Sequence, residues 1–296
     1  MRILVTGSSG FIGSALVSSL TAAGHTVTRL VRREPKDGEV LWNPATSSID
    51  AAALEGHDAA VHLAGENIAG RWTPAKKARI KESRVKGTRL LAETLARLTK
   101  APKVLVSASA IGYYGDRGDA VLREESSSGS GFLAEVAREW EAATQPAALK
   151  GMRVVNLRIG VVLSPQGGAL AQMLLPFKLG LGGKMGTGRQ YMSWIALDEL
   201  VNIIQHALAA ETLKGAVNAV SPKPVTNLEF TKTLGRVLGR PTIFPMPAFA
   251  ARAAFGEMAD ELLLGSTRVE PGRLVASGYQ FRYPDLEGAL RHLLRK

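Results

Sequence analysis

Short apolar runs alternate with amphipathic segments along most of the chain. Five runs have the length and composition of buried strands, at residues 2–6, 26–31, 59–63, 103–107 and 153–158. Between them, apolar residues repeat with a helical period at 11–23, 74–98 and 132–149. Short β-branched strands separated by helices are typical of a parallel sheet covered on both faces. The pattern therefore predicts an α/β protein with a doubly wound parallel sheet, which binds ligands at the carboxyl ends of its strands.

The composition and periodicity of the sequence change after about residue 163. Residues 164–191 are rich in glycine, and residues 244–296 have the pattern of helices joined by Pro-Gly turns. We therefore predict two domains. Residues 1–220 form the nucleotide-binding domain, with a Gly-rich insertion near 164–191 on the substrate side, and residues 221–296 form a smaller, mostly helical substrate domain packed against it.

Three glycines between the first strand and the first helix predict a phosphate site. Gly7, Gly10 and Gly13 allow a tight turn, a close approach of backbone to phosphate, and close packing of the helix on the sheet. The free N–H groups of the helix then face a pyrophosphate. The spacing indicates a Rossmann-type dinucleotide site, the alternative being a glycine-rich turn that holds no ligand.

The end of the second strand distinguishes between dinucleotides. A site for NAD usually has Asp or Glu here to bind the ribose hydroxyls, whereas this segment ends in Arg32 and Arg33. Guanidinium groups bind phosphate well, and a carboxylate would repel it. The sequence therefore predicts NADP as the cofactor, unless one or both arginines only face water.

Composition excludes several kinds of chemistry. The 296 residues contain no cysteine, so disulfides, thiolate metal sites and cysteine nucleophiles are excluded, which fits a cytoplasmic protein. The five histidines lack ligand spacing, and we expect no metal. No stretch resembles a signal peptide or a membrane span, so we expect no membrane partner.

The net charge of +11 is concentrated in one predicted helix. Between Arg71 and Arg89 there are eight basic residues and one acidic residue, Glu82. The segment is interpreted as a solvated helix face, as a site for an anionic ligand, or as a nucleic-acid surface. No stacking aromatic residues lie among the charges, so nucleic acid is the least favoured partner.

Several motifs resemble a known family. TGSSGFIG at 6–13, HLAG at 62–65 and SASAIGYYG at 107–115 resemble the extended short-chain dehydrogenase/reductases, the nucleotide-sugar epimerase group. A narrower resemblance, from LAGENIAGRW at 63–72 to the segment 255–290, is to the atypical "epimerase family protein" group. That group has a C-terminal domain of unknown function, and its members are described as NADP-binding proteins with no settled reaction.

The resemblance implies a role for each matching residue. Arg32 would bind the adenosine 2′-phosphate, and Ser107 to Ser109 would lie near the nicotinamide. The adenosine-side ribose would lie against Leu63, Ala64 and Gly65. The pyrophosphate would be held by the first turn, with Thr6, Gly7, Ser9, Gly10, Phe11, Ile12 and Gly13.

The chain departs from this family at two positions. Ordinary members use a Tyr-x-x-x-Lys pair as acid and base, but residues 115–150 contain no tyrosine and only Lys150. Ser109, Tyr113 and Tyr114 are the remaining catalytic candidates. For the tyrosines, packing against the cofactor or the adjoining loop is the favoured interpretation. Arg84 stands where the family commonly has asparagine, either facing an anion or solvated.

Together these features predict an NADP-binding oxidoreductase or epimerase acting on a small polar substrate, such as a nucleotide-activated sugar. The alternative is a non-catalytic NADP(H) sensor that lost the acid/base pair. Trp194 and Asp198 match a segment that forms part of the family's substrate cleft, although Asp198 is equally a candidate cap for a helix beginning at Glu199.

Overall fold

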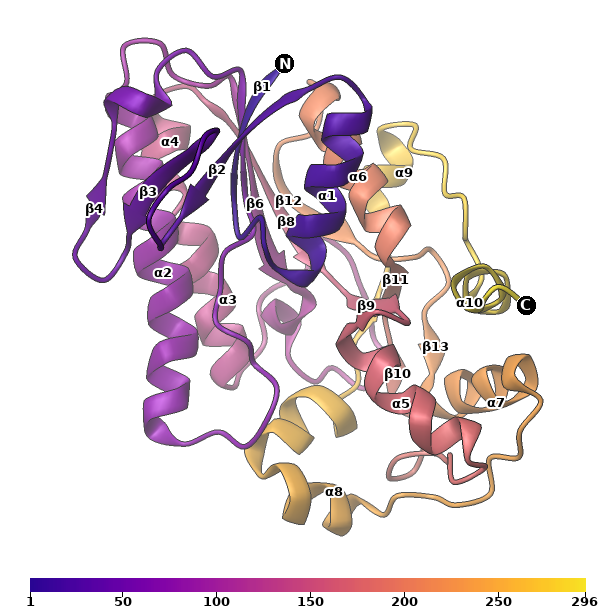
Figure 1. Cartoon of the computed structure of the whole chain (residues 1–296). Helices are drawn as coiled ribbons and strands as arrows, with labels where there is room; N and C mark the ends of the chain where they lie inside the picture. The colour runs from indigo at the N-terminus through magenta and orange to yellow at the C-terminus, as the bar shows by residue number, and fades with distance from the viewer.

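An eight-stranded sheet forms the centre of the computed structural model, which describes residues 1–296 (Figure 1). All neighbouring strands are parallel except the last pair, β3 and β4. The strand order is β12 (Gly215–Ala219), β8 (Arg153–Ile159), β6 (Val104–Ala110), β5 (Ala59–His62), β1 (Arg2–Thr6), β2 (Thr26–Val31), β3 (Glu39–Asn43) and β4 (Ser48–Ile49). The predicted parallel sheet is confirmed, and β3, β4 and β12 are strands that the apolar pattern did not predict.

Helices cover both faces of this sheet, as the doubly wound prediction requires (Figure 1). One face carries α1 (Phe11–Ala22), α6 (Leu197–Ala209) and α9 (Gly272–Ala276), which share a core of 22 buried residues with the strands. The opposite face carries α2 (Pro74–Arg97), α3 (Phe132–Ala142) and α4 (Gln145–Leu149). The strand order reverses between β1 and β5, so the carboxyl ends of these two strands form the switch point where such sheets bind ligands.

The helix predicted over 132–149 is two helices in the structure. Helix α3 ends at Ala142, and α4 begins at Gln145. Pro146 lies in the first turn of α4, where a backbone N–H has no partner within the helix and is not needed. Inside a continuous helix, the same proline would remove a backbone hydrogen bond and break the helix. The periodic pattern alone did not reveal this break.

The part of the molecule beside the main sheet is built from later elements. Helices α5 (Gly168–Lys178), α7 (Asn227–Leu238) and α10 (Leu286–Leu294) enclose a separate apolar core of 11 buried residues. Three short strand pairs connect this part to the main sheet: β9 (Val161–Ser164) with β11 (Trp194–Ala196), β10 (Tyr191–Met192) with β13 (Val225–Thr226), and β7 (Val121–Leu122) with β14 (Arg268–Val269).

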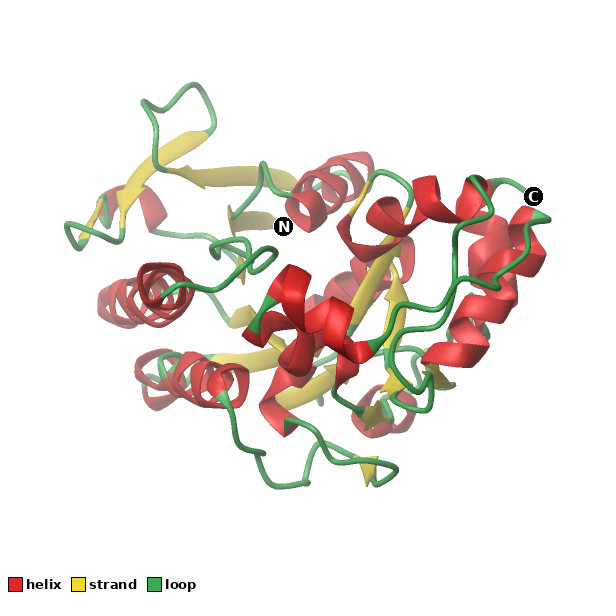
Figure 2. Ribbon diagram, turned by 90° about the horizontal axis from the view of Figure 1, so that it is seen from below, coloured by secondary structure: helices red, strands yellow, loops and turns green.

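Helix α8 (Ala248–Phe255) and the π-helical turn η3 (Ala259–Leu264) pack against the first half of the chain. Between them, Met258 packs with Trp72 and Ile80 in a small buried cluster, and Glu257 forms a salt bridge with Lys77 at 2.8 Å. Seen from below, helices and loops of this region lie in front of the sheet (Figure 2). None of the helices is both long enough and apolar enough to cross a membrane.

The remaining short helices are the 3-10 turns η1 (Ala52–Leu54) and η2 (Ile111–Tyr114). Turn η2 directly follows the carboxyl end of β6, so it brings Tyr113 and Tyr114 to the same edge of the sheet as the glycine-rich turn.

Candidate functional site

The glycine-rich turn lies between β1 and α1 and packs directly on the end of β5. Gly7 has a φ of +67°, and a Cβ atom there would lie 2.7 Å from the carbonyl carbon of Leu63. A Cβ on Gly13 would lie 2.1 Å from the Gly7 carbonyl oxygen. Both positions therefore require glycine, since any side chain would push the turn away from the strands.

Thr6 joins the two strands at the switch point. Its Oγ1 accepts hydrogen bonds from the backbone N–H groups of Leu63 (3.2 Å) and Ala64 (3.3 Å) and lies 2.7 Å from Nδ1 of His62. Burial lowers the pKa of His62 to about 4, so its ring is neutral at pH 7. With two N–H donors on its oxygen, the Thr6 hydroxyl donates to Nδ1. The structure thus brings together the predicted pyrophosphate and ribose segments.

The first turn of α1 keeps its backbone N–H groups free of side-chain caps. The N-cap residue is Gly10, which has no side chain to accept their hydrogen bonds, and the first turn has no acidic residue. These groups and the helix dipole favour an anion at this end. Ile12 follows within the same turn and packs against the core of the sheet.

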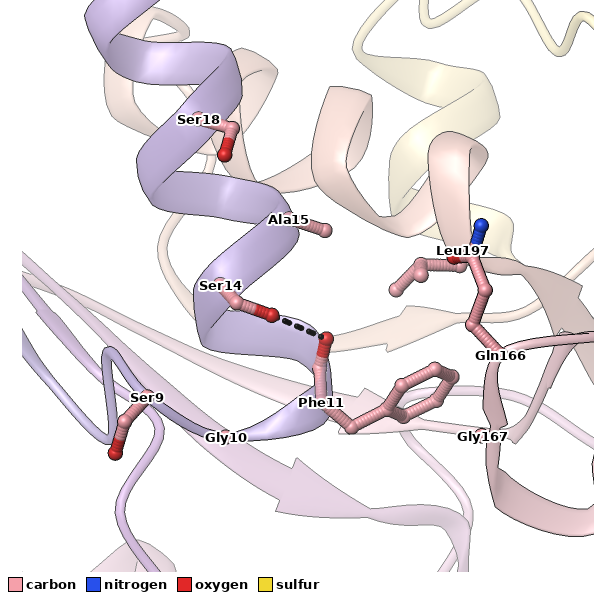
Figure 3. Close-up of a pocket in the computed structure, with 9 residues that line it drawn as sticks. All are labelled: Ser9, Gly10, Phe11, Ser14, Ala15, Ser18, Gln166, Gly167 and Leu197. Carbon is pink, nitrogen blue, oxygen red and sulfur yellow. Dashed lines mark hydrogen bonds between the residues drawn. The ribbon is translucent and has the colours of Figure 1, made fainter.

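A cavity of about 410 Å³ adjoins this end of α1 (Figure 3). It is lined by Ser9, Gly10 and Phe11 on one side and by Gln166 and Gly167 on the other. The Phe11 ring lies so close to Gly167 that a Cβ there would be 2.7 Å from a ring carbon. Phe11 therefore joins the predicted phosphate turn to the loop that precedes α5.

The two arginines after β2 have different surroundings. Arg33 donates to Glu39 at 2.6 Å and to the Glu34 carbonyl at 2.8 Å, so its guanidinium already has a carboxylate partner. Arg32 directly follows the last residue of the strand, is exposed, and forms no hydrogen bond or salt bridge within the chain. Of the two predicted phosphate ligands, Arg32 is the one with a free guanidinium.

Arg84 lies against the predicted ribose segment rather than in solvent. Its Nη1 donates to the carbonyls of Glu66 (3.0 Å) and Ile80 (3.1 Å), and its guanidinium lies 5.0 Å from the Trp140 ring centroid. A Cβ on Gly65 would lie 3.3 Å from the guanidinium carbon. Burial lowers the pKa of Arg84 to about 10, which still leaves a cation beside Gly65 at pH 7.

The other basic residues of α2 mostly have acidic partners. Lys76 pairs with Glu66 at 2.9 Å, and Lys81 pairs with both Glu135 and Glu139 at 2.7 Å. These pairs lie at least partly in solvent, and their carboxylates offset part of the positive charge of the helix.

A buried polar network lies under the predicted reaction centre. Ser109, near the end of β6, donates from Oγ to Glu141 at 2.7 Å. Glu141 also accepts two hydrogen bonds from the Arg158 guanidinium, at 2.8 and 2.9 Å. Ser107 is fully buried, and its hydroxyl donates to the Ala108 carbonyl at 3.3 Å. Both serine hydroxyls therefore have partners inside the protein.

The two predicted tyrosines differ sharply. Tyr114 is fully buried, and its hydroxyl lies 2.9 Å from Arg158 Nη1 and 2.7 Å from Asn218 Oδ1. Burial raises the pKa of Tyr114, although hydrogen bonds with Arg158 and Asn218 oppose this. Tyr113 is only half-buried; its ring lies 3.5 Å from the Arg158 guanidinium, and its hydroxyl forms no hydrogen bond within the chain.

Arg158 and Glu141 were missed by sequence reasoning, although Arg158 leaves a signal. Arg158 interrupts the apolar strand β8 with a charge, and Glu141 lies near the end of α3. A charge within a buried strand implies a buried partner. The sequence does not say which acidic residue that partner is, because the two residues meet only through the fold.

The structure contradicts the expected cleft position of Trp194 and the expected helix cap at Asp198. Trp194 is fully buried in the core between α5, α7 and α10, and its Nε1 donates to the Lys223 carbonyl, so it does not face a cleft. Helix α6 begins at Leu197 with Ala196 as its N-cap. Asp198 therefore lies inside the first turn and contacts His292 at 2.8 Å instead of capping the helix.

A glycine turn at the switch point of a parallel sheet is typical of dinucleotide-binding α/β proteins. Comparison with known families agrees: this chain belongs to the NAD dependent epimerase/dehydratase family, whose model matches residues 3–219. Residues 246–293 match a domain of unknown function, DUF1731. No three His, Asp or Glu side chains lie close enough together to hold a metal ion.

Individual relatives cover the whole chain. It is 48% identical over 290 residues to the epimerase family protein Mb2239 of Mycobacterium bovis, covering 97% of this chain and 96% of the relative. The human epimerase family protein SDR39U1, whose crystal structure contains NADPH, is 39% identical in sequence to this chain. The two structures match with a TM-score of 0.92 over the full length of both chains. A nucleoside-diphosphate sugar epimerase from Corynebacterium glutamicum is 40% identical, with a TM-score of 0.83; 99% of this chain matches 58% of that one.

Proposed function

We propose that this protein binds NADP(H) and uses it as an oxidoreductase or epimerase. The observation that carries the proposal is the turn from Thr6 to Gly13, which is closed onto Leu63 and Ala64 and leaves the N–H groups of α1 free. The relative crystallised with NADPH, which has the same fold over its full length, supports this choice of cofactor.

Each part of the cofactor has fitting residues in this chain. The pyrophosphate would lie on the uncapped end of α1, and the adenosine 2′-phosphate would pair with the free guanidinium of Arg32. The ribose would lie against Leu63 to Gly65, with the Arg84 cation beneath Gly65. Bound NADPH supplies a hydride; the chain itself must orient the substrate and supply the proton.

Tyr113 is the best candidate to supply that proton. Its hydroxyl has no partner in the chain, whereas the hydroxyls of Ser109 and Tyr114 are held in the buried network. A neutral phenol donates a proton more readily than it removes one at pH 7, which favours reduction of a carbonyl. Ser109 and Tyr114 would then act as positioning residues through Glu141 and Arg158.

The substrate to test first is a nucleotide-activated sugar or its keto form. This choice is supported by the relative described as a nucleoside-diphosphate sugar epimerase and by the family of the chain. A non-catalytic NADP(H) sensor is the second candidate. It is favoured by the engaged hydroxyls of Ser109 and Tyr114 and by the absence of a tyrosine or lysine in α3.

The cofactor prediction is tested by titration calorimetry with NADPH and NADH. Arg32→Ala removes a charge-assisted contact to phosphate and should weaken NADPH binding about tenfold to a hundredfold, with little change for NADH. Arg33→Ala is the matched control, because Arg33 already pairs with Glu39. Equal affinity of the unaltered protein for the two cofactors would count against an NADP site.

The catalytic prediction is tested by NADPH oxidation with a panel of carbonyl substrates and nucleotide keto-sugars. Tyr113→Phe should lower turnover about a hundredfold, the usual contribution of a positioned acid, and leave NADPH affinity unchanged. Tyr283→Phe, which alters a tyrosine stacked on His292 elsewhere, is the control. Full activity of Tyr113→Phe would exclude this phenol. Tight NADPH binding without turnover on any substrate would favour the sensor.

A further inference from the structure

An apolar surface lies at the end of the molecule formed by α5 and the loop after it, the loop between α7 and α8, and the start of α8. Six large apolar side chains on these elements are between 54% and 74% exposed. We call them the apolar rim: Leu175, Leu179, Leu181, Ile243, Phe244 and Phe249. Single exposed apolar residues are ordinary, but a group of this size marks an interaction surface.

Two segments that carry part of the apolar rim run side by side. The N–H of Phe244 donates to the Gly182 carbonyl at 3.3 Å, and the N–H of Met246 donates to the Lys184 carbonyl at 2.9 Å. Pro241, Pro245 and Pro247 restrict the second segment to extended conformations. In Figure 1 this segment runs along the lower edge of the molecule between α7 and α8.

The segments that carry the apolar rim contain basic residues but no acidic ones. Residues 142–197 and 230–256 contain no Asp or Glu. Lys178, Lys184, Arg189 and Arg240 lie on the same segments and form no salt bridge. Basic side chains elsewhere, such as Lys77 and Lys81, do have acidic partners. The surface therefore combines exposed apolar groups with unpaired cations.

We propose that the apolar rim docks on an anionic lipid bilayer, with Phe244 and Phe249 entering the interface and the nearby lysines and arginines facing lipid phosphates. Aromatic and aliphatic side chains bordered by Lys and Arg are the composition that binds such interfaces. The net charge of +11 repels a second copy of the chain and attracts an anionic surface. A bilayer also needs no shape-matched groove, which suits an extended loop at the molecular edge.

This proposal is independent of the cofactor site. The sequence-based expectation of no membrane partner came from the lack of a spanning segment, and a peripheral contact needs none. Leu149 and Val275 are also exposed, at 80% and 58%, but lie on α4 and α9, away from the apolar rim. They provide matched control positions for its substitution.

The test is co-sedimentation of the full-length protein with vesicles of phosphatidylglycerol and phosphatidylcholine, compared with vesicles of phosphatidylcholine alone. The protein should sediment with the anionic vesicles, and added salt should weaken this binding. Phe244→Ser with Phe249→Ser, and separately Lys178→Gln with Lys184→Gln and Arg240→Gln, should each weaken binding about tenfold or more. Leu149→Ser with Val275→Ser should bind as the unaltered protein does, and thermal melting should show that each variant is folded.

Several results would overturn the proposal. They are absence of binding to anionic vesicles, equal binding to neutral vesicles, and unchanged binding of both sets of rim variants. Sedimentation equilibrium is run in parallel: a dimer that dissociates on Phe244→Ser with Phe249→Ser would assign the apolar rim to self-association instead. Rim-dependent binding of poly-glutamate in preference to vesicles would assign it to an acidic protein.

Discussion

His62 is a buried base whose ring touches both the phosphate turn and the core of the sheet. Its Nδ1 is bonded to Thr6, and its ring packs edge-on to Trp42 at 5.9 Å between centroids. Protonating the ring would place an unpaired charge in the core, because its Nε2 is buried without a partner. The neutral form is therefore the one that the folded protein accepts.

This gives a pH-dependent stability with a definite sign. The pKa of His62 is about 4 when folded and 6.5 when unfolded, so the unfolded chain binds the proton more tightly. The free energy of unfolding should fall by about 3 kcal/mol as pH drops from about 6.5 to 4 because of this group alone. The free energy of unfolding of His62→Gln, measured with urea across this pH range, should not show this decrease of about 3 kcal/mol.

The other histidines are present in both the unaltered chain and His62→Gln, so their contributions to the pH dependence cancel in the comparison. His25→Gln, which alters a histidine near the surface, is the control and should keep the full dependence. Parallel stability curves for His62→Gln and the unaltered chain between pH 4 and 7 would contradict the assigned pKa.

Helix α3 depends on a side chain from far along the sequence. Its N-cap residue is Gly131, which has no side chain to act as a cap. The carboxylate of Glu261 in η3 instead accepts hydrogen bonds from the N–H groups of Phe132 (3.0 Å) and Leu133 (3.3 Å). An acidic group at this end also interacts favourably with the helix dipole.

Removing this cap should destabilise the helix and the fold. Glu261→Ala should lower the free energy of unfolding by about 1–2 kcal/mol, and Glu261→Gln by less, because the amide keeps one acceptor oxygen. Chemical unfolding followed by circular dichroism measures both. Asp37→Ala, in an exposed loop, should change little; a loss as large as that of Glu261→Ala would mean that the effect is not capping.

The elements that the sequence predicts best are those determined by local pattern. Strands β1 and β2 match their predicted bounds, since their apolar runs end at a glycine turn and at two arginines. Strand β3 alternates buried and more exposed residues near the sheet edge, and its pattern of Glu39, Val40 and Trp42 did not identify it. The apolar pattern also predicted one continuous helix over 132–149, whereas the structure has a break before α4.

The candidate site divides in the same way. Glycine spacing predicted the phosphate turn, because the turn is made by consecutive residues. The contact of Glu141 with Arg158 joins α3 to β8, and the sequence cannot tell which of Arg32 and Arg33 pairs with Glu39. Such contacts depend on register and packing between distant segments, so only the structure shows them.

At the scale of the molecule, the C-terminal region and the first half of the chain share a small buried core. The side chain of Met258, on the C-terminal side, is buried against Trp72 and Ile80 from the first half. Met258→Ala should therefore lower the free energy of unfolding by about 2–4 kcal/mol, while Lys77→Ala, which removes a half-exposed salt bridge, should cost less than about 1 kcal/mol.

The shared core also predicts how the protein unfolds. Denaturation followed by circular dichroism and by tryptophan fluorescence should give coincident transitions, for the unaltered chain and for both variants. Two separate transitions would show instead that the C-terminal part unfolds alone and that the Met258 contact is not needed for the first half.

The capping of α3 by Glu261 has a consequence for inheritance. A helix in one half of the chain is completed by a carboxylate encoded some 130 codons later, at separations of 129 and 128 residues from its two partners. Recombination between two relatives at a point between these halves would place α3 of one relative beside the capping segment of the other. The two halves therefore form a matched pair, and functional chimeras require crossover points that transfer Glu261 together with the start of α3.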